Sequence, residues 1–173
     1  MLCVMNAAAE RLIAQLGLVP LPHEGGFFRR TWTSSESLPN GRSAGSAIYF
    51  LLTETDFSAL HRMPTDELWF FHAGDVVEHV QLNGSEPGLE LTRMGGDLMT
   101  GQAPQLIVPG GTWQGARLAP PLINESRNRR NGWALMSCTM APAWDEQEFV
   151  LGNRPGLLRE FPKAAPWIEV LTR

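Results

Sequence analysis

Cysteine and charge are both scarce in this sequence. Only two cysteines, Cys3 and Cys138, occur among its 173 residues, and charged residues make up 18% with a formal net charge of −4. Two cysteines cannot form a framework of several disulfides, and so few of them are typical of a reducing compartment. The low charge leaves no broad basic face to neutralise phosphates, so nucleic acid is not an expected partner.

Long hydrophobic runs are also missing. None approaches the roughly 18 apolar residues of a membrane-spanning helix. The first residues do not combine a basic segment with an apolar stretch, as a secretion signal would. We therefore expect a soluble, cytoplasmic protein that has no membrane partner.

Hydrophobic, turn-forming and aromatic residues are plentiful. The sequence is 43% hydrophobic and contains 13 prolines, 17 glycines, six tryptophans and eight phenylalanines. This composition favours many short strands joined by tight turns over a helical bundle. The length fits one domain over residues 1–173, with a core at about 18–152.

Helices are expected only near the two ends. Asn6 can cap a helix in which Ala9, Leu12, Ile13 and Leu16 recur at helical spacing, and Gly17 is placed to end it. Apolar residues between 157 and 171 predict a short C-terminal helix that covers an end or edge of the sheet.

Eight runs of β-branched, aromatic and aliphatic residues predict strands. They cover residues 25–32, 46–52, 67–72, 76–82, 89–93, 105–108, 112–118 and 133–140. The segment between residues 52 and 67 is expected to be a short polar connection. This number of short strands predicts a mainly β fold, a jelly-roll β-barrel.

A group of polar residues follows the spacing of two cupin motifs. His61, Glu67 and Gly74 keep the spacing of the first motif, in which a second histidine would stand at Met63. The second motif, Pro-x-Gly followed by a histidine, resembles Pro109-Gly110-Gly111 with Gln114 at the histidine position. A thioether and a carboxamide are weak ligands for divalent ions, so we expect neither a metal site nor another cofactor.

The chain resembles one cupin subfamily in particular, known as DUF985 or cupin_5. The matching segments lie at residues 22–29, 46–52, 57–62, 66–69, 74–75, 101–105, 108–114 and 138–142. The resemblance implies a single cupin jelly roll, frequent pairing as a homodimer and an undefined biochemical role.

The polar candidates each leave two interpretations open. His61 is a general base if Glu67 orients its imidazole, or else an anchor for a polar pocket. Glu67 starts an apolar strand, so its carboxylate points inward to a partner or outward to solvent. Arg29 holds a carboxylate or phosphate of a ligand, or pairs with Glu24.

The aromatic candidates are Tyr49, Trp69, Phe71 and Trp113. They stack on a planar or sugar-like ligand, or they form ordinary core. Strand alternation places His72 opposite Glu67, and His79 lies on the next predicted strand, so both histidines are left out of the site.

Three functions follow in order of preference. The first is a cupin that binds a small organic ligand in a metal-independent pocket formed by Arg29, Tyr49, His61, Glu67, Trp69, Phe71, Trp113 and Gln114. The second is an enzyme that resembles sugar-nucleotide epimerases, with His61 as base, Glu67 as its orienter and Tyr49 as acid. A metal-dependent dioxygenase or isomerase is third.

Overall fold

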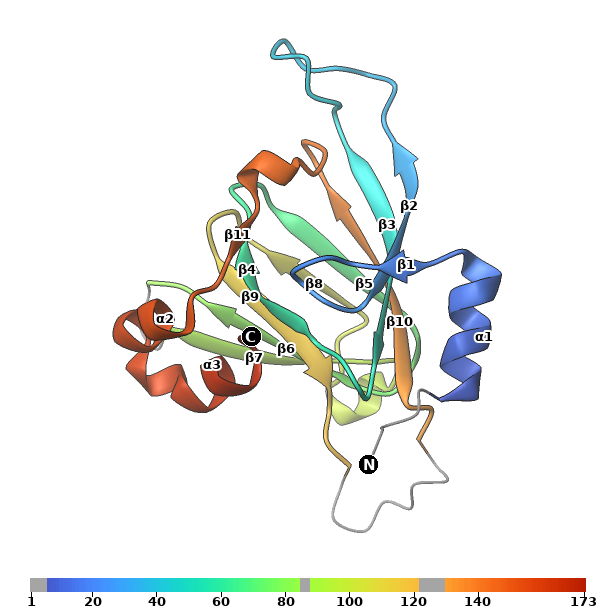
Figure 1. Cartoon of the computed structure of the whole chain (residues 1–173), viewed down its shortest axis with the longest axis vertical. Helices are drawn as coiled ribbons and strands as arrows, with labels where there is room; N and C mark the ends of the chain where they lie inside the picture. Colours follow the sequence, from blue (N-terminus) through green and yellow to red (C-terminus); the bar gives the residue numbers. More distant parts are fainter. Residues whose placement is uncertain (1–5, 85–87, 122–129) are drawn as a thin grey trace.

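Two antiparallel sheets face each other and enclose the main hydrophobic core (Figure 1). The structure is a computed structural model, and it describes residues 6–84, 88–121 and 130–173. The six-stranded sheet has the order β1 (Val19–Pro20), β2 (Phe27–Thr33), β3 (Ser46–Thr53), β10 (Trp133–Met140), β5 (Glu67–Gly74), β8 (Gln105–Val108). The five-stranded sheet has the order β11 (Val150–Leu151), β4 (Ser58–Arg62), β9 (Trp113–Leu118), β6 (Val77–Leu82), β7 (Leu89–Met94).

The chain passes repeatedly from one sheet to the other, as in a jelly roll. Strand β3 belongs to the first sheet, β4 to the second and β5 to the first again. Their inner faces meet in a core that includes Phe50, Trp69, Ala116 and Met136. The prediction of a mainly β jelly roll is therefore confirmed, and each of the eight predicted strands is present within two residues of its expected ends.

Strand β4 was missed from the sequence. Residues 53–66 were expected to form a polar connection, but Ser58–Arg62 is a strand that carries His61 into the second sheet. Four of its five residues are buried, because one face lies on the cavity between the sheets and the other lies under the C-terminal segment. Burial on both faces removes the alternation that would have marked it as a strand.

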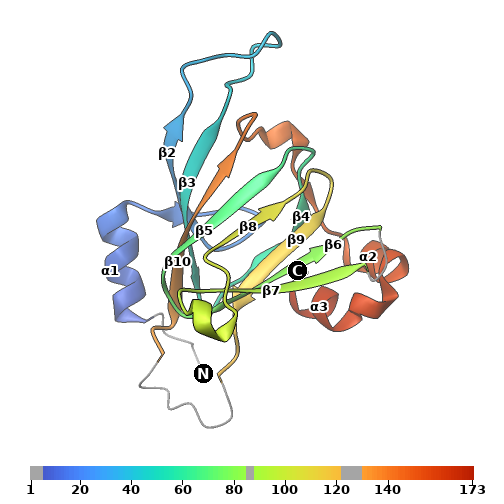
Figure 2. The same cartoon turned by 180° about the vertical axis from the view of Figure 1, so that it is seen from behind.

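The helices lie outside the two sheets (Figures 1 and 2). Helix α1 (Ala7–Leu16) is capped by the Asn6 side chain, which accepts a hydrogen bond from the Ala8 N–H, and ends at Gly17 in the left-handed conformation, as predicted. Helices α2 (Arg154–Glu160) and α3 (Ala165–Val170) cover the outer face of the second sheet. The described residues also contain three 3₁₀ turns: η1 (Leu98–Thr100), η3 (Glu146–Glu148) and η4 (Pro162–Ala164).

The C-terminal helices seal a second apolar cluster against the sheet. Leu157, Phe161, Ile168 and Leu171 are buried there against residues of β4, β6 and β9, including Trp113. None of the helices in the described part of the chain is long and apolar enough to cross a membrane.

Candidate functional site

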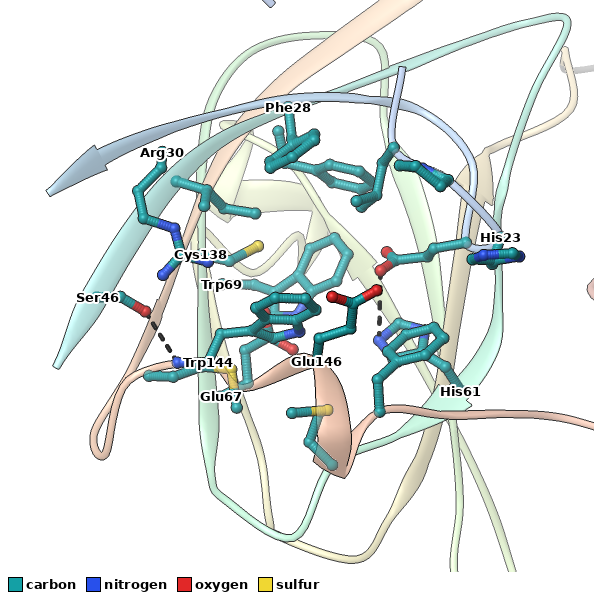
Figure 3. A pocket seen from close by; sticks show the side chains of 18 residues that line it. His23, Phe28, Arg30, Ser46, His61, Glu67, Trp69, Cys138, Trp144 and Glu146 are labelled. Carbon is teal, nitrogen blue, oxygen red and sulfur yellow. Dashed lines mark hydrogen bonds and ion pairs between the residues drawn. The ribbon is translucent and has the colours of Figure 1, made fainter. Parts of the chain in front are cut away.

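A cavity of about 270 Å³ opens at one end of the space between the sheets (Figure 3). Strands β2, β3, β4, β5 and β10 contribute to its wall, together with the segments that follow β1 and β10. The side chains that line it are those of Leu21, Pro22, His23, Glu24, Phe28, Arg30, Ser46, Ile48, Phe50, His61, Met63, Glu67, Trp69, Cys138, Met140, Trp144, Glu146 and Phe149. Most of this lining is apolar or aromatic, so the few polar groups stand out.

His61 is fixed in the cavity wall in a defined orientation. Its Nδ1 lies 2.8 Å from the Ala59 carbonyl oxygen, and its ring stacks on Phe149 with the centroids 5.3 Å apart. A carbonyl oxygen can only accept a hydrogen bond, so Nδ1 carries the proton. In the neutral ring, Nε2 is therefore left with a free lone pair, and it lies 3.8 Å from Glu24 Oε2.

Glu24 forms a small polar group with His61, which the sequence had not indicated. Its carboxylate accepts a hydrogen bond of 2.7 Å from the buried Ser58 hydroxyl, and its backbone oxygen accepts one from the Ala59 N–H. The next residue, Gly25, has φ +100, and a Cβ there would lie 2.4 Å from the Phe57 carbonyl oxygen. Glycine thus lets this segment approach β4 closely enough for Glu24 to reach His61.

Glu67 belongs to a second polar group, centred on Gln114. Trp69 Nε1 can only donate, and it donates to Gln114 Oε1 over 3.0 Å. Gln114 Nε2 must then be the donor of the 2.6 Å bond to Glu67 Oε2. His79 Nε2 lies 3.3 Å from the same Gln114 oxygen and donates to it.

Burial decides the charge states in this second group. It raises the pKa of Glu67, assisted by the nearby charge of Glu24, while His61 and the hydrogen bonds from Gln114 and Trp69 oppose the rise. Burial lowers the pKa of His79 to about 3, so this ring is neutral at pH 7. Its Nδ1 has no hydrogen-bond partner among the described residues.

His79, which the sequence left out of the site, does not line the cavity, but it donates a hydrogen bond to Gln114. Val77, His79 and Gln81 alternate along β6 with residues of the opposite face, and this alternation brings His79 onto the inner side beside Trp69, with ring centroids 4.9 Å apart. The sequence shows the alternation within β6, but only the pairing of β6 with β9 brings His79 beside Gln114.

Cys138 faces the cavity from β10, next to Glu67. Burial raises the pKa of the Cys138 thiol well above its ordinary value, and the charges of Glu67 and Glu24 and a hydrogen bond to Glu67 raise it further. The thiol is therefore a poor nucleophile in the folded chain. It is a free cysteine, and Cys3 lies outside the described residues.

Five of the eight predicted ligand-binding residues do not line the cavity. Arg29 and Tyr49 pack against each other on the outer face of the first sheet, with the guanidinium 5.6 Å from the ring centroid. Trp113 lies beneath the C-terminal helices, and Phe71 packs against the core deeper between the sheets. Gln114 is the fifth, and it supports Glu67 from behind. The remaining three predicted residues, His61, Glu67 and Trp69, line the cavity.

The arginine that does line the cavity is the neighbour of Arg29. Phe28 and Arg30 point inward, whereas Arg29 is exposed. On β3, Ser46, Ile48 and Phe50 point inward in the same way, which turns Tyr49 outward. Apolar and polar residues do not alternate along β2 or β3. The sequence therefore did not indicate which face of these strands points inward.

The residues at the cupin ligand positions do not fit a metal ion. Those positions hold His61, Met63, Glu67 and Gln114, and both ends of the Gln114 amide are already used by neighbouring side chains. Within residues 6–84, 88–121 and 130–173, no three His, Cys, Asp or Glu side chains are grouped to hold a metal. Thioether sulfur and a hydrogen-bonded carboxamide are poor substitutes for imidazole.

Two facing antiparallel sheets, with His61, Glu67 and Gln114 on β4, β5 and β9 beside a cavity, define a cupin-type protein. The family model described as "Cupin superfamily (DUF985)" matches residues 10–152, so the chain belongs to this family. A search of curated proteins finds no match.

Solved structures support the same conclusion. A hypothetical protein from Leishmania major has 28% sequence identity and a TM-score of 0.83, with 95% of this chain and 98% of that one covered. A protein from Shewanella oneidensis has 30% identity and a TM-score of 0.83, with 98% and 99% covered. A cupin 2 conserved barrel domain protein from Rhodopseudomonas palustris has 15% identity and a TM-score of 0.57, with 90% and 89% covered, and shows the fold alone.

Proposed function

We propose that the cavity binds a compact organic molecule without the help of a metal ion. The observation that supports this most directly is the contrast within the lining, where apolar and aromatic side chains surround a few polar groups at fixed places. Such a lining is typical of small-molecule sites, in which apolar contact supplies affinity and a few polar groups fix orientation. The volume of about 270 Å³ suits a ligand of roughly one ring with its substituents.

A cavity-filling variant tests this proposal. Ile48 lines the cavity from β3, so Ile48→Trp should occupy part of its volume. We expect ligand-observed NMR with a library of small organic compounds to find binders of the unmodified protein that Ile48→Trp loses. Leu91→Trp, at an exposed position on β7, is the matched control and should keep them. Binding that survives in Ile48→Trp would place the ligand elsewhere and refute the proposal.

Acid–base catalysis is a second candidate, supported by the state of His61. Its Nε2 carries a free lone pair in the neutral ring, as a general base requires. Glu67 has a raised pKa and so holds a proton more readily than an exposed carboxyl. It replaces Tyr49, which lies on the outer face of the sheet, as the candidate acid.

This candidate predicts hydrogen exchange at carbon. An epimerisation beside a carbonyl group moves a proton from the carbon to His61 Nε2 and returns a proton to the same carbon. In heavy water, incubation with 4-keto sugar nucleotides should therefore place deuterium on that carbon, and His61→Gln should abolish the exchange. If no exchange occurs with any of them, binding without catalysis is the better description.

A further inference from the structure

Arg30 supplies a cation to the wall of the cavity. Its guanidinium lies 5.6 Å from the ring centroid of Trp144. Within the part of the chain that the structure describes, it makes neither a salt bridge nor a hydrogen bond. The residue is half-buried, and burial lowers the pKa of Arg30, so its charge is less well solvated than that of an exposed arginine. An arginine in such surroundings normally has a partner.

The three carboxylates of the lining are in a different situation. Glu24 is held by Ser58 and lies near His61, and Glu67 accepts a hydrogen bond from Gln114. Glu146 is exposed and is therefore solvated by water. A cationic ligand would thus meet carboxylates that are already bonded or hydrated, whereas Arg30 is the group that gains most from an incoming charge.

Ser46 and Trp144 lie beside Arg30 in the cavity wall. Ser46 is almost fully buried, and its Oγ accepts a hydrogen bond of 3.1 Å from the Trp144 backbone N–H. The hydroxyl proton of Ser46 has no acceptor among the described residues, so it remains free to donate. Figure 3 shows Arg30, Ser46 and Trp144 together on one side of the cavity, with His61 on the opposite side.

We propose that Arg30 and Ser46 form an anion-binding end of the cavity and that the ligand is a compact organic acid with one carboxylate. This inference rests on the proposed function, since it concerns the ligand of the same cavity. A single guanidinium without a partner among the described residues matches a single negative charge, and the carboxylates of Glu24 and Glu67 in the same lining disfavour a dianion such as a phosphate monoester. The Trp144 ring completes the site as a surface for a planar ligand.

Three probes of equal size and different charge test the inference. They are 4-hydroxybenzoate, its neutral amide 4-hydroxybenzamide, and the cationic 4-hydroxybenzylamine, each titrated by calorimetry or ligand-observed NMR. We expect the carboxylate to bind at least about 10-fold more tightly than the amide, because hydrogen bonds to a charged group add this much. The amine should bind most weakly. Phenyl phosphate, the dianionic arm, should bind more weakly than the carboxylate.

Two arginine variants separate a contact from a general effect of charge. Arg30→Gln should erase the preference for the carboxylate, with at least about 10-fold weaker binding of the acid and less than about twofold change for the amide. Arg29→Gln removes the same charge from the outer face of the same strand and should leave both affinities within about twofold. Ser46→Ala should weaken the acid alone, and it provides a second variant if Arg30→Gln does not fold.

The outcomes distinguish the two proposals. If the amide or amine binds as tightly as the carboxylate, or Arg30→Gln keeps the preference, the anion site is refuted while the cavity keeps its binding function. If phenyl phosphate binds most tightly, the single-carboxylate ligand is refuted. If none of these probes binds while the compound library yields binders that Ile48→Trp loses, the inference fails and the proposed function stands. If binding persists in Ile48→Trp, the proposed function itself fails and the inference fails with it.

Discussion

Gln114 donates a hydrogen bond of 2.6 Å from its amide nitrogen to the buried carboxyl of Glu67. The direction of this bond is set by Trp69, whose N–H can only donate and occupies the amide oxygen. Gln114 stands at the position where the cupin motif has a metal-binding histidine, and here it links two strands. Gln114 joins β9 of one sheet to β5 of the other.

Replacement of Gln114 should destabilise the fold. Gln114→Leu leaves the Trp69 N–H, the His79 N–H and the Glu67 carboxyl without their common partner in a buried place. We expect the free energy of unfolding, measured with urea, to fall by about 2–3 kcal/mol. Gln105→Leu, at an exposed position on β8, should change it by less than about 0.5 kcal/mol. Equal effects of the two variants would contradict the linking role.

His79 should make the stability depend on pH. Burial lowers the pKa of His79 from 6.5 to about 3. Between these two pH values the imidazole of His79 is therefore protonated in the unfolded chain and neutral in the folded chain. The contribution of His79 to the free energy of unfolding is therefore fully present above pH 6.5 and is lost as the pH falls toward 3. Between pH 7 and pH 5 the free energy of unfolding falls by about 2 kcal/mol through this group.

The His79→Gln variant isolates this contribution. Urea unfolding at pH 7 and at pH 5 gives the loss of unfolding free energy over this range for each protein. We expect this loss to be about 2 kcal/mol smaller in His79→Gln than in the unmodified protein. His72→Gln is the control, because His72 is exposed and lies on the outer face, where it bonds Ser137. The same pH dependence in the protein and in His79→Gln would show that His79 is not buried as a neutral ring.

Cys138 should react slowly with thiol reagents. Burial raises the pKa of this thiol, so little thiolate is present at pH 8. In a Cys3→Ser background, we expect less than about one tenth of a thiol to react with a disulfide reagent in the native state and one thiol after denaturation. Rapid stoichiometric reaction in the native state would mean that Cys138 is exposed or ionised.

The protein should contain little bound metal. Met63 and Gln114 stand at two of the four cupin ligand positions, so purification without chelator should yield less than about one transition ion per ten chains by elemental analysis. A chelator should leave the midpoint of thermal unfolding unchanged, because no structural ion is removed. A stoichiometric ion would refute the assignment of a metal-independent cavity.

Much of the fold could be predicted from the sequence because its signals are local. Helix α1 begins after the Asn6 cap and ends at the left-handed Gly17, as expected, and turn residues separate the strands. Strand β4 was not predicted because Ser58–Arg62 has neither strong β propensity nor an alternation of apolar and polar residues. The spacing of His61, Glu67 and Gln114 predicted that they share one polar site, and the structure brings Glu67 and Gln114 into direct contact.

The sequence by itself determined most of the strands, both ends of α1 and a first set of candidate polar residues. Only the tertiary structure decided which side of each strand faces the cavity. That choice put Arg30 in the cavity wall in place of Arg29, turned Tyr49 outward and set His79 beside Gln114. The physical reason is that the direction of a side chain in a buried strand depends on register, bulges and the partner strand, and β2 has an irregularity between Arg30 and Trp32. None of these is visible in a run of residues read alone.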